Sequence, residues 1–154
     1  MLKSHTCRML NSIAFGALLG FGCASASRRG LSDLLQHPIE VEVRGVRSDQ
    51  GVLRIAVYDN RETFLRGGGI LHGVSVPPTT TRVELDVPDR RPVVISVFHD
   101  LDGDAQLRRG AFGIPIEPWG FSGRPSLVGP PSWEACAIVP EPDAVVVIDL
   151  RGLP

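Results

Sequence analysis

Lysine, paired cysteines, aromatic residues and long apolar runs are all scarce in this sequence. Of its 154 residues, only Lys3 is lysine, three are cysteine and 6% are aromatic. The apolar run at 13–23 has 11 residues, whereas a membrane-spanning helix needs about 20. The three glycines at 67–69 lack the lysine and the strand-to-helix context of a phosphate-binding loop, so a flexible hairpin tip is the better interpretation. These absences argue against a membrane-spanning segment and a nucleotide site.

The first 26 residues have the organisation of a secretory signal peptide. Lys3 and Arg8 provide positive charge without an acid nearby, the apolar run follows, and 24–26 reads Ala-Ser-Ala. This order predicts cleavage after Ala26 and export to the periplasm or the medium. Lipidation at Cys23 is the less favoured alternative, because Gly20 stands where a lipoprotein signal usually has a leucine-like residue.

The remaining chain divides into a tether at 27–38 and one domain at 39–154, a size typical of a single core. Without the signal it has fourteen arginines against seventeen acidic residues, a net charge of −3. A mildly acidic chain without a basic stripe gives no electrostatic reason to bind nucleic acid. Cys136 would then be the one remaining cysteine, so no internal disulfide can form, and a buried inert thiol is favoured over a reactive nucleophile.

Apolar and charged residues alternate from Ile39 onward, as expected for strands with one buried face. Turn residues separate the alternating segments, and the first two are expected to be hairpin neighbours. Glycines and prolines exclude a long helix or a central strand from the connection at 59–78. We therefore expect an all-β, immunoglobulin-like or transthyretin-like antiparallel β-sandwich of about six to seven strands. The expected strands are 39–44, 52–58, 79–87, 93–98, 135–139 and 144–150.

A long segment from His99 to Glu134 separates two of these strands. It spans about 35 residues, whereas structureless connections beyond about 15 residues are uncommon unless functional or disordered. Its large apolar groups are too many for a solvated tail. We therefore expect an ordered insert packed on the sandwich edge through Phe112, Ile114, Ile116, Trp119 and Phe121.

Three aspartates open the insert at alternating positions, namely Asp100, Asp102 and Asp104. This spacing matches the first side-chain ligands of a calcium loop, so Ca²⁺ is one interpretation. Ala105, Arg108 and Ala111 stand where such a loop needs glycine, a later oxygen ligand and a final acid. The favoured alternative is a polar turn with no cofactor, in which the aspartates bond their own backbone or pair with Arg108 and Arg109.

Other residues of the insert suggest chemistry or binding. His99, Asp100 and Glu117 could serve a hydrolase-type enzyme, but neighbours in a strand point to opposite faces and no nucleophile or metal triad accompanies them. A structural histidine is therefore favoured, with no catalytic residue. Trp119, Phe121 and Trp133 could form an aromatic platform for a sugar or peptide, although packing is the favoured alternative.

Three blocks of the chain form a recognisable pattern, namely Val97-Phe-His-Asp-Leu-Asp-Gly-Asp104, Phe112-Gly-Ile-Pro-Ile-Glu-Pro-Trp-Gly-Phe-Ser122 and Gly129-Pro-Pro-Ser-Trp-Glu-Ala135. This pattern resembles the DUF2141 family of exported bacterial proteins of unknown function. The resemblance covers Ile39 to Leu150. It implies a signal peptide, a small β-sandwich and no established activity, and it identifies a shared loop that contains His99, Asp100, Asp102, Gly113, Pro115, Glu117, Gly120, Phe121 and Ser122.

The combined expectation is an exported, non-catalytic domain that presents the segment His99 to Arg124 to an unknown envelope ligand or protein. The candidate binding residues are His99, Glu117, Trp119, Phe121, Ser122 and Arg124. A hydrolase-type enzyme and a purely structural domain are the alternatives. The membrane would be involved only through the signal peptide or lipidation at Cys23.

Overall fold

The computed structural model describes residues 35–66, 69–126 and 129–152. The predicted signal peptide at 1–26, lipidation at Cys23 and most of the predicted tether lie outside these residues, as does the side chain of Phe112. Among these residues, none of the helices has the length and hydrophobicity of a membrane-spanning segment.

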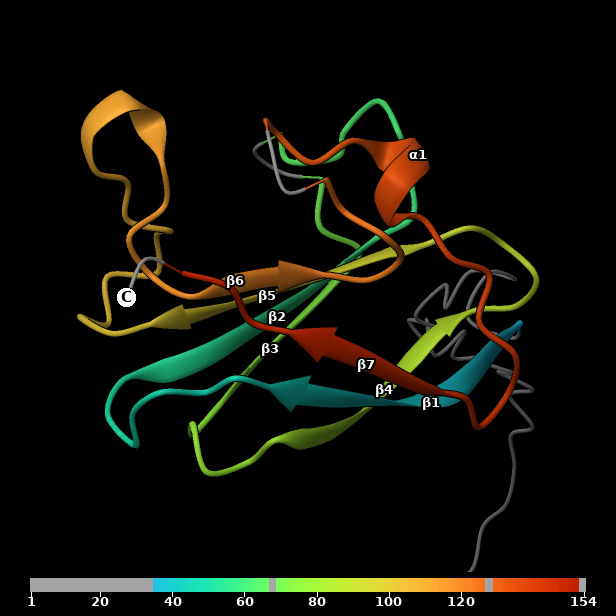
Figure 1. Ribbon diagram of the computed structural model, residues 1–154. Helices are drawn as coiled ribbons and strands as arrows, with labels where there is room; N and C mark the ends of the chain where they lie inside the picture. Colours follow the sequence, from blue (N-terminus) through green and yellow to red (C-terminus); the bar gives the residue numbers. More distant parts are fainter. Residues whose placement is uncertain (1–34, 67–68, 127–128, 153–154) are drawn as a thin grey trace, which may run out of the picture.

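In the part of the chain that the structure describes, seven strands form two stacked sheets (Figure 1). The three-stranded sheet has the order β4-β1-β7, and the four-stranded sheet has the order β3-β2-β5-β6. The expected all-β sandwich is therefore confirmed. The strands are β1 (Gln36–Arg44), β2 (Val52–Tyr58), β3 (His72–Val76), β4 (Arg82–Pro88), β5 (Val94–Asp100), β6 (Trp119–Phe121) and β7 (Val145–Asp149).

The core between the sheets is formed by strands in which buried apolar residues alternate with outward-facing residues. Ile39, Val41 and Val43 of β1 are buried, and the charged residues between them point outward. The same two-residue period buries Leu53, Ile55 and Val57 in β2, as predicted. The core is completed by Leu85, Val87, Val93, Ile95, Val97, Ile148 and Leu150. Each fully buried aliphatic side chain stabilises the folded state by about 1.5–3 kcal/mol relative to the same side chain left exposed to water.

The expected pairing of the first two strands is wrong. β1 pairs antiparallel with β4 and parallel with β7, while β2 pairs with β3 and β5 in the other sheet. The segment 45–51 therefore crosses between sheets instead of closing a hairpin. β1 also begins at Gln36, three residues before the expected start of the domain.

The strand expected at 135–139 is also wrong. A helical turn, α1 (Trp133–Cys136), occupies its start, and Ser132 caps it by accepting a hydrogen bond from the Ala135 N–H. Ile138 makes only an isolated bridge to Val93. A short apolar run fits a helical turn as well as a strand, and here the capping serine starts a turn.

Two strands lie within segments expected to be loops. β3 lies between the glycines and prolines of 59–78, and it is an edge strand, the position where such residues are tolerated. β6 lies inside the insert and extends the sheet beside β5. The insert therefore leaves the sheet after β5 and returns to it. The expected packing of Ile114 and Ile116 on the sandwich edge is wrong, because both side chains are exposed.

Gly120 of β6 allows the two sheets to approach at one edge. A Cβ atom there would lie 2.7 Å from the carbonyl oxygen of Asp149 and 2.8 Å from Cγ2 of Ile148. We predict that Gly120→Ala lowers the free energy of unfolding by about 1–3 kcal/mol through overpacking, measured by urea denaturation.

Gly73→Ala in β3 is the matched control for this prediction. A Cβ atom at Gly73 would meet its nearest neighbour at 3.7 Å, an ordinary contact. The change should be neutral or stabilising, because alanine reduces the entropy lost on folding. Equal effects of the two substitutions would contradict the close-approach explanation.

Candidate functional site

The insert projects from one end of the sandwich. A hairpin of residues 108–116, called the insert hairpin below, is held by Ile116 N–H donating to the Arg108 carbonyl (3.0 Å) and Gly110 N–H donating to the Ile114 carbonyl (2.8 Å). A 3-10 turn, η2 (Ala111–Gly113), forms its tip. Figure 1 shows the hairpin standing apart from the turn at α1 on the same side of the molecule.

Asp100 organises the start of the insert from a fully buried position. Its carboxylate accepts hydrogen bonds from Arg54 Nε (2.6 Å), Gly103 N–H (2.8 Å) and Ala105 N–H (3.0 Å). Burial alone would raise the pKa of Asp100, but the Arg54 hydrogen bond and charge and the two N–H donors outweigh it and lower the pKa. Asp100 is therefore the ionised anchor of the turn.

Glu117 is the second buried anchor. It is 3% exposed, and its two carboxylate oxygens accept hydrogen bonds from the N–H groups of Leu101 and Arg108, both at 2.8 Å. Leu101 lies just after β5 and Arg108 opens the insert hairpin. One side chain thus joins both sides of the segment 101–108.

The turn between these anchors has the contacts of the polar-turn interpretation. Asp102 and Asp104 are exposed and accept hydrogen bonds from the N–H groups of residues two positions later. Asp102 also lies 3.6 Å from the Arg108 guanidinium. Ala105 has a φ of 64°, the left-handed conformation in which a calcium loop normally has glycine.

Carboxylates do converge, in a different combination from the one expected. Oxygen atoms of Asp100, Asp102 and Glu117 all lie within 4.8 Å of one another. Glu117 takes the place of Asp104, whose Oδ1 accepts from Gln106 N–H at 2.7 Å. Three carboxylates could serve as calcium ligands, but Arg54 and Arg108 already offset two of their charges.

His99 and Asp100 point to opposite sides of β5. His99 is fully buried on the core side, and its Nε2 donates to the Gln50 carbonyl at 2.7 Å. This contact ties the turn before β2 to the end of β5. The structure therefore does not bring His99 together with Asp100 and Glu117 as a group open to a substrate.

Ser122 is an internal connector. Its Oγ accepts from the Ile95 N–H (2.9 Å) and donates to the Cys136 carbonyl (2.8 Å), which links β5 to the end of α1. Cys136 is buried, and burial raises the pKa of its thiol, as expected for the inert interpretation. Neither side chain is accessible.

The other candidate residues lie outside the main core, and Phe121 and Trp133 pack against a second buried cluster of Tyr58, Val94 and Cys136. Trp119, Phe121 and Trp133 are half-buried, and Arg124 is exposed. Phe64 packs edge-to-face against Phe121 and Trp133, with ring centroids 5.9 Å apart in both pairs. These rings are thus neither fully exposed nor buried.

Arg54 is the key residue that sequence reasoning missed. It lies on the outer face of β2, where alternation predicts an exposed charge. Only the pairing of β2 with β5 places it beside Asp100, 46 positions later.

A separate shallow hollow of about 220 Å³ lies on the outer face of the three-stranded sheet. It is lined by Pro38, Ile39, Glu40, Glu84, Asp143 and Val145. None of the candidate residues of the insert contributes to it.

The role of Asp100 predicts a pH-dependent loss of stability in Asp100→Asn. The variant loses charge-assisted hydrogen bonds, each contributing about 1.5–3 kcal/mol. Because the native pKa lies below its ordinary value of 3.8, this stabilisation is fully present above pH 3.8 and is lost as the pH falls further. Urea denaturation should therefore show a large deficit at pH 7 that shrinks below pH 3.8.

Asp102→Asn removes an equal charge from an exposed position and serves as the control. It should change the free energy of unfolding by less than about 1 kcal/mol at pH 7. A deficit at Asp102 equal to that at Asp100 would contradict the anchoring role.

Calcium can be tested by thermal melting with excess Ca²⁺ and with chelator. We predict equal melting temperatures, because arginines and N–H groups already compensate the converging carboxylates. A bound ion at 100 times its dissociation constant would stabilise the fold by about 2.7 kcal/mol. An increase of several degrees with Ca²⁺ that Glu117→Gln abolishes would contradict the prediction.

Comparison with known proteins gives one match. The model of a family described as an uncharacterized protein conserved in bacteria (DUF2141) matches residues 41–147. The comparison with curated proteins found no match, and neither did the comparison with solved structures. The matched segment runs from the first strand into the last and contains the whole insert, and the chain therefore belongs to the DUF2141 family.

Proposed function

We propose that this protein is an exported, non-catalytic domain that uses the segment His99 to Arg124 to bind an envelope ligand or partner protein. Export is supported by the signal-like sequence at 1–26. Binding is supported by one observation: the insert is anchored internally through buried carboxylates, while its hairpin exposes apolar side chains.

The exposed apolar groups of the insert include Leu101, Ile114 and Ile116. Their backbone is constrained on both sides by Glu117 and by the hydrogen bonds of the insert hairpin. A constrained loop loses little entropy when it binds a partner. Apolar groups on such a loop gain free energy when a partner removes them from water.

The hydrolase alternative receives less support from the same geometry. His99, Asp100 and Glu117 are all buried, and Asp100 and Glu117 have their oxygens occupied by N–H donors of the insert. A general acid or base must reach the proton that it transfers. The purely structural alternative would favour complete burial of Trp119, Phe121 and Trp133, which instead remain half-buried.

The hairpin surface can be tested with Ile114→Ser/Ile116→Ser. These side chains are 49% and 37% exposed, so the variant should fold like the wild type. We predict that it captures its envelope partner from extracts at least tenfold less well, because the apolar contact surface is lost. Quantitative pulldown followed by mass spectrometry measures the effect.

Val145→Ser/Val147→Ser is the matched control on β7. The two valines are 54% and 39% exposed, nearly the same as the isoleucine pair, and they lie in the three-stranded sheet, away from the insert hairpin. Capture by this variant should equal that of the wild type. Loss of capture in the β7 variant alone would place the binding surface elsewhere.

A further inference from the structure

A row of aromatic side chains lies on the outer face of the four-stranded sheet. Trp119 packs against Phe121 at 5.7 Å between centroids, and Phe64 contacts Phe121 and Trp133 at 5.9 Å. Phe64, Phe121 and Trp133 also pack against a second buried cluster of Tyr58, Val94 and Cys136, whereas Trp119 does not. These four half-buried rings are called the aromatic strip below. A Cβ atom on Gly120 would point inward at β7. Because neighbouring residues of a strand point to opposite faces, the side chains of Trp119 and Phe121 point outward.

Three arginines differ from the rest. Within the part of the chain that the structure describes, the side chains of Arg66, Arg124 and Arg151 have no hydrogen bond or ion pair, and all three residues are exposed. The other described arginines pair with a carboxylate, or with a backbone carbonyl in the case of Arg47 and Arg109. These three guanidinium groups are therefore free to pair with an external anion.

All three belong to backbone that adjoins the aromatic strip. Arg151 and Trp119 exchange two backbone hydrogen bonds of 2.7 Å, so their side chains project on the same face. Arg124 follows Phe121 by three residues and donates its N–H to the Ala135 carbonyl, two residues after Trp133. Arg66 follows Phe64 by two residues in the same turn.

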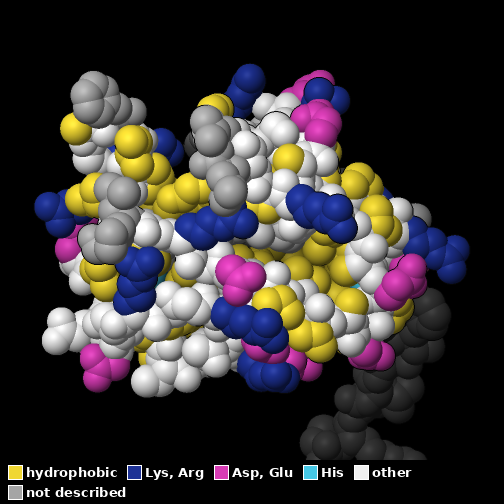
Figure 2. Space-filling view, viewed as in Figure 1, with side chains coloured by type: hydrophobic (Ala, Val, Ile, Leu, Met, Phe, Trp, Pro, Cys, Tyr) yellow, Lys and Arg dark blue, Asp and Glu magenta, His cyan; other side chains and the backbone are white. Residues whose placement is uncertain are grey.

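Figure 2 shows hydrophobic and arginine side chains adjoining one another over β6 and at the base of the insert hairpin. This surface offers two kinds of contact to a ligand, one polar and one apolar. Guanidinium groups pair with carboxylates through two parallel hydrogen bonds. Aromatic rings pack against the apolar C–H faces of sugar rings, which removes both from water. An acidic glycan offers both groups in alternation along one chain.

We infer that the aromatic strip and its three arginines bind an acidic polysaccharide, with sugar rings on Trp119 and carboxylates on Arg124 and Arg151. This inference rests on the proposed binding function and gives its ligand class. Both tryptophans of the chain, Trp119 and Trp133, belong to the strip. Their fluorescence therefore reports binding directly.

The test titrates the full mature chain with polygalacturonate and follows tryptophan fluorescence. We expect saturable binding that weakens with salt, because exposed charge pairs are screened. Arg124→Ala and Arg151→Ala should each weaken binding about tenfold, the value of one charge-assisted contact. Both side chains are exposed and unpaired, so these variants should retain the fold.

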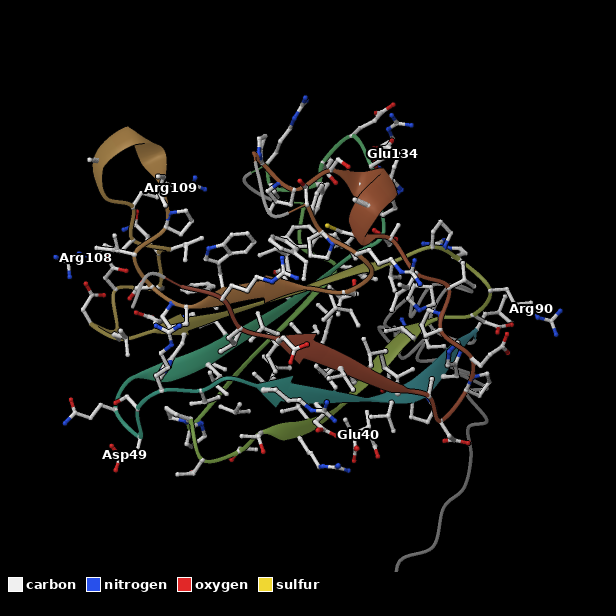
Figure 3. All side chains as sticks on the ribbon, viewed as in Figure 1. Glu40, Asp49, Arg90, Arg108, Arg109 and Glu134 are labelled. Carbon is white, nitrogen blue, oxygen red and sulfur yellow. The ribbon has the colours of Figure 1, made fainter. Side chains whose placement is uncertain are left out.

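Arg90→Ala is the control of equal charge. Arg90 is 92% exposed, and Figure 3 shows it at the opposite end of the molecule from Arg108 and Arg109 of the insert hairpin. Its removal should change affinity less than twofold. An effect equal to that of Arg124→Ala would show that net charge alone attracts the polymer and would overturn the inference.

Two further polymers distinguish the ligand class. Dextran, which has sugar rings without charge, and polyglutamate, which has charge without sugar rings, should each bind at least tenfold more weakly than polygalacturonate. Equal binding of either polymer, or no binding of polygalacturonate, would overturn the inference. The proposed function fails separately, when Ile114→Ser/Ile116→Ser leaves capture from envelope extracts unchanged.

Discussion

Two buried carboxylates, Asp100 and Glu117, carry the main constraint on this structure. A chain that leaves the end of a sheet has N–H groups that no longer meet a neighbouring strand, and buried donors without an acceptor are costly. The two carboxylates accept from four such donors in the segment 101–108. Arg54 supplies the positive charge that makes burial of Asp100 tolerable.

This constraint divides the insert into an inner and an outer part. Three ionisable side chains that were candidates for catalysis, those of His99, Asp100 and Glu117, belong to the inner part and hold the backbone. The outer part presents apolar, aromatic and arginine side chains, together with the exposed Asp102 and Asp104, on a backbone held by these contacts. The proposed binding function relies on this outer part, whose side chains offer contact area and fixed charge.

The edge of the sandwich contributes the rest of this surface. β6 is only three residues long, yet it carries Trp119 and Phe121 to the outer face while Gly120 approaches β7. Arg151 then closes the edge by pairing with Trp119. Residues from the insert and from the C-terminal segment therefore form one face, although about thirty positions separate them along the chain.

Local patterns by themselves determined the buried face of each long strand and the presence of an ordered insert, because alternation is a property of neighbouring residues. Ile39, Val41 and Val43 needed no partner to be assigned to the core. The same local reasoning failed at 135–139, where a short apolar run is compatible with a helical turn, and at the first two strands, where nearness in sequence suggested a hairpin. Only the tertiary structure decided that β2 pairs with β5, that Arg54 meets Asp100, and that Glu117 rather than Asp104 joins the carboxylate group. Strand register and sheet order depend on the packing of the whole core, and no short segment encodes them.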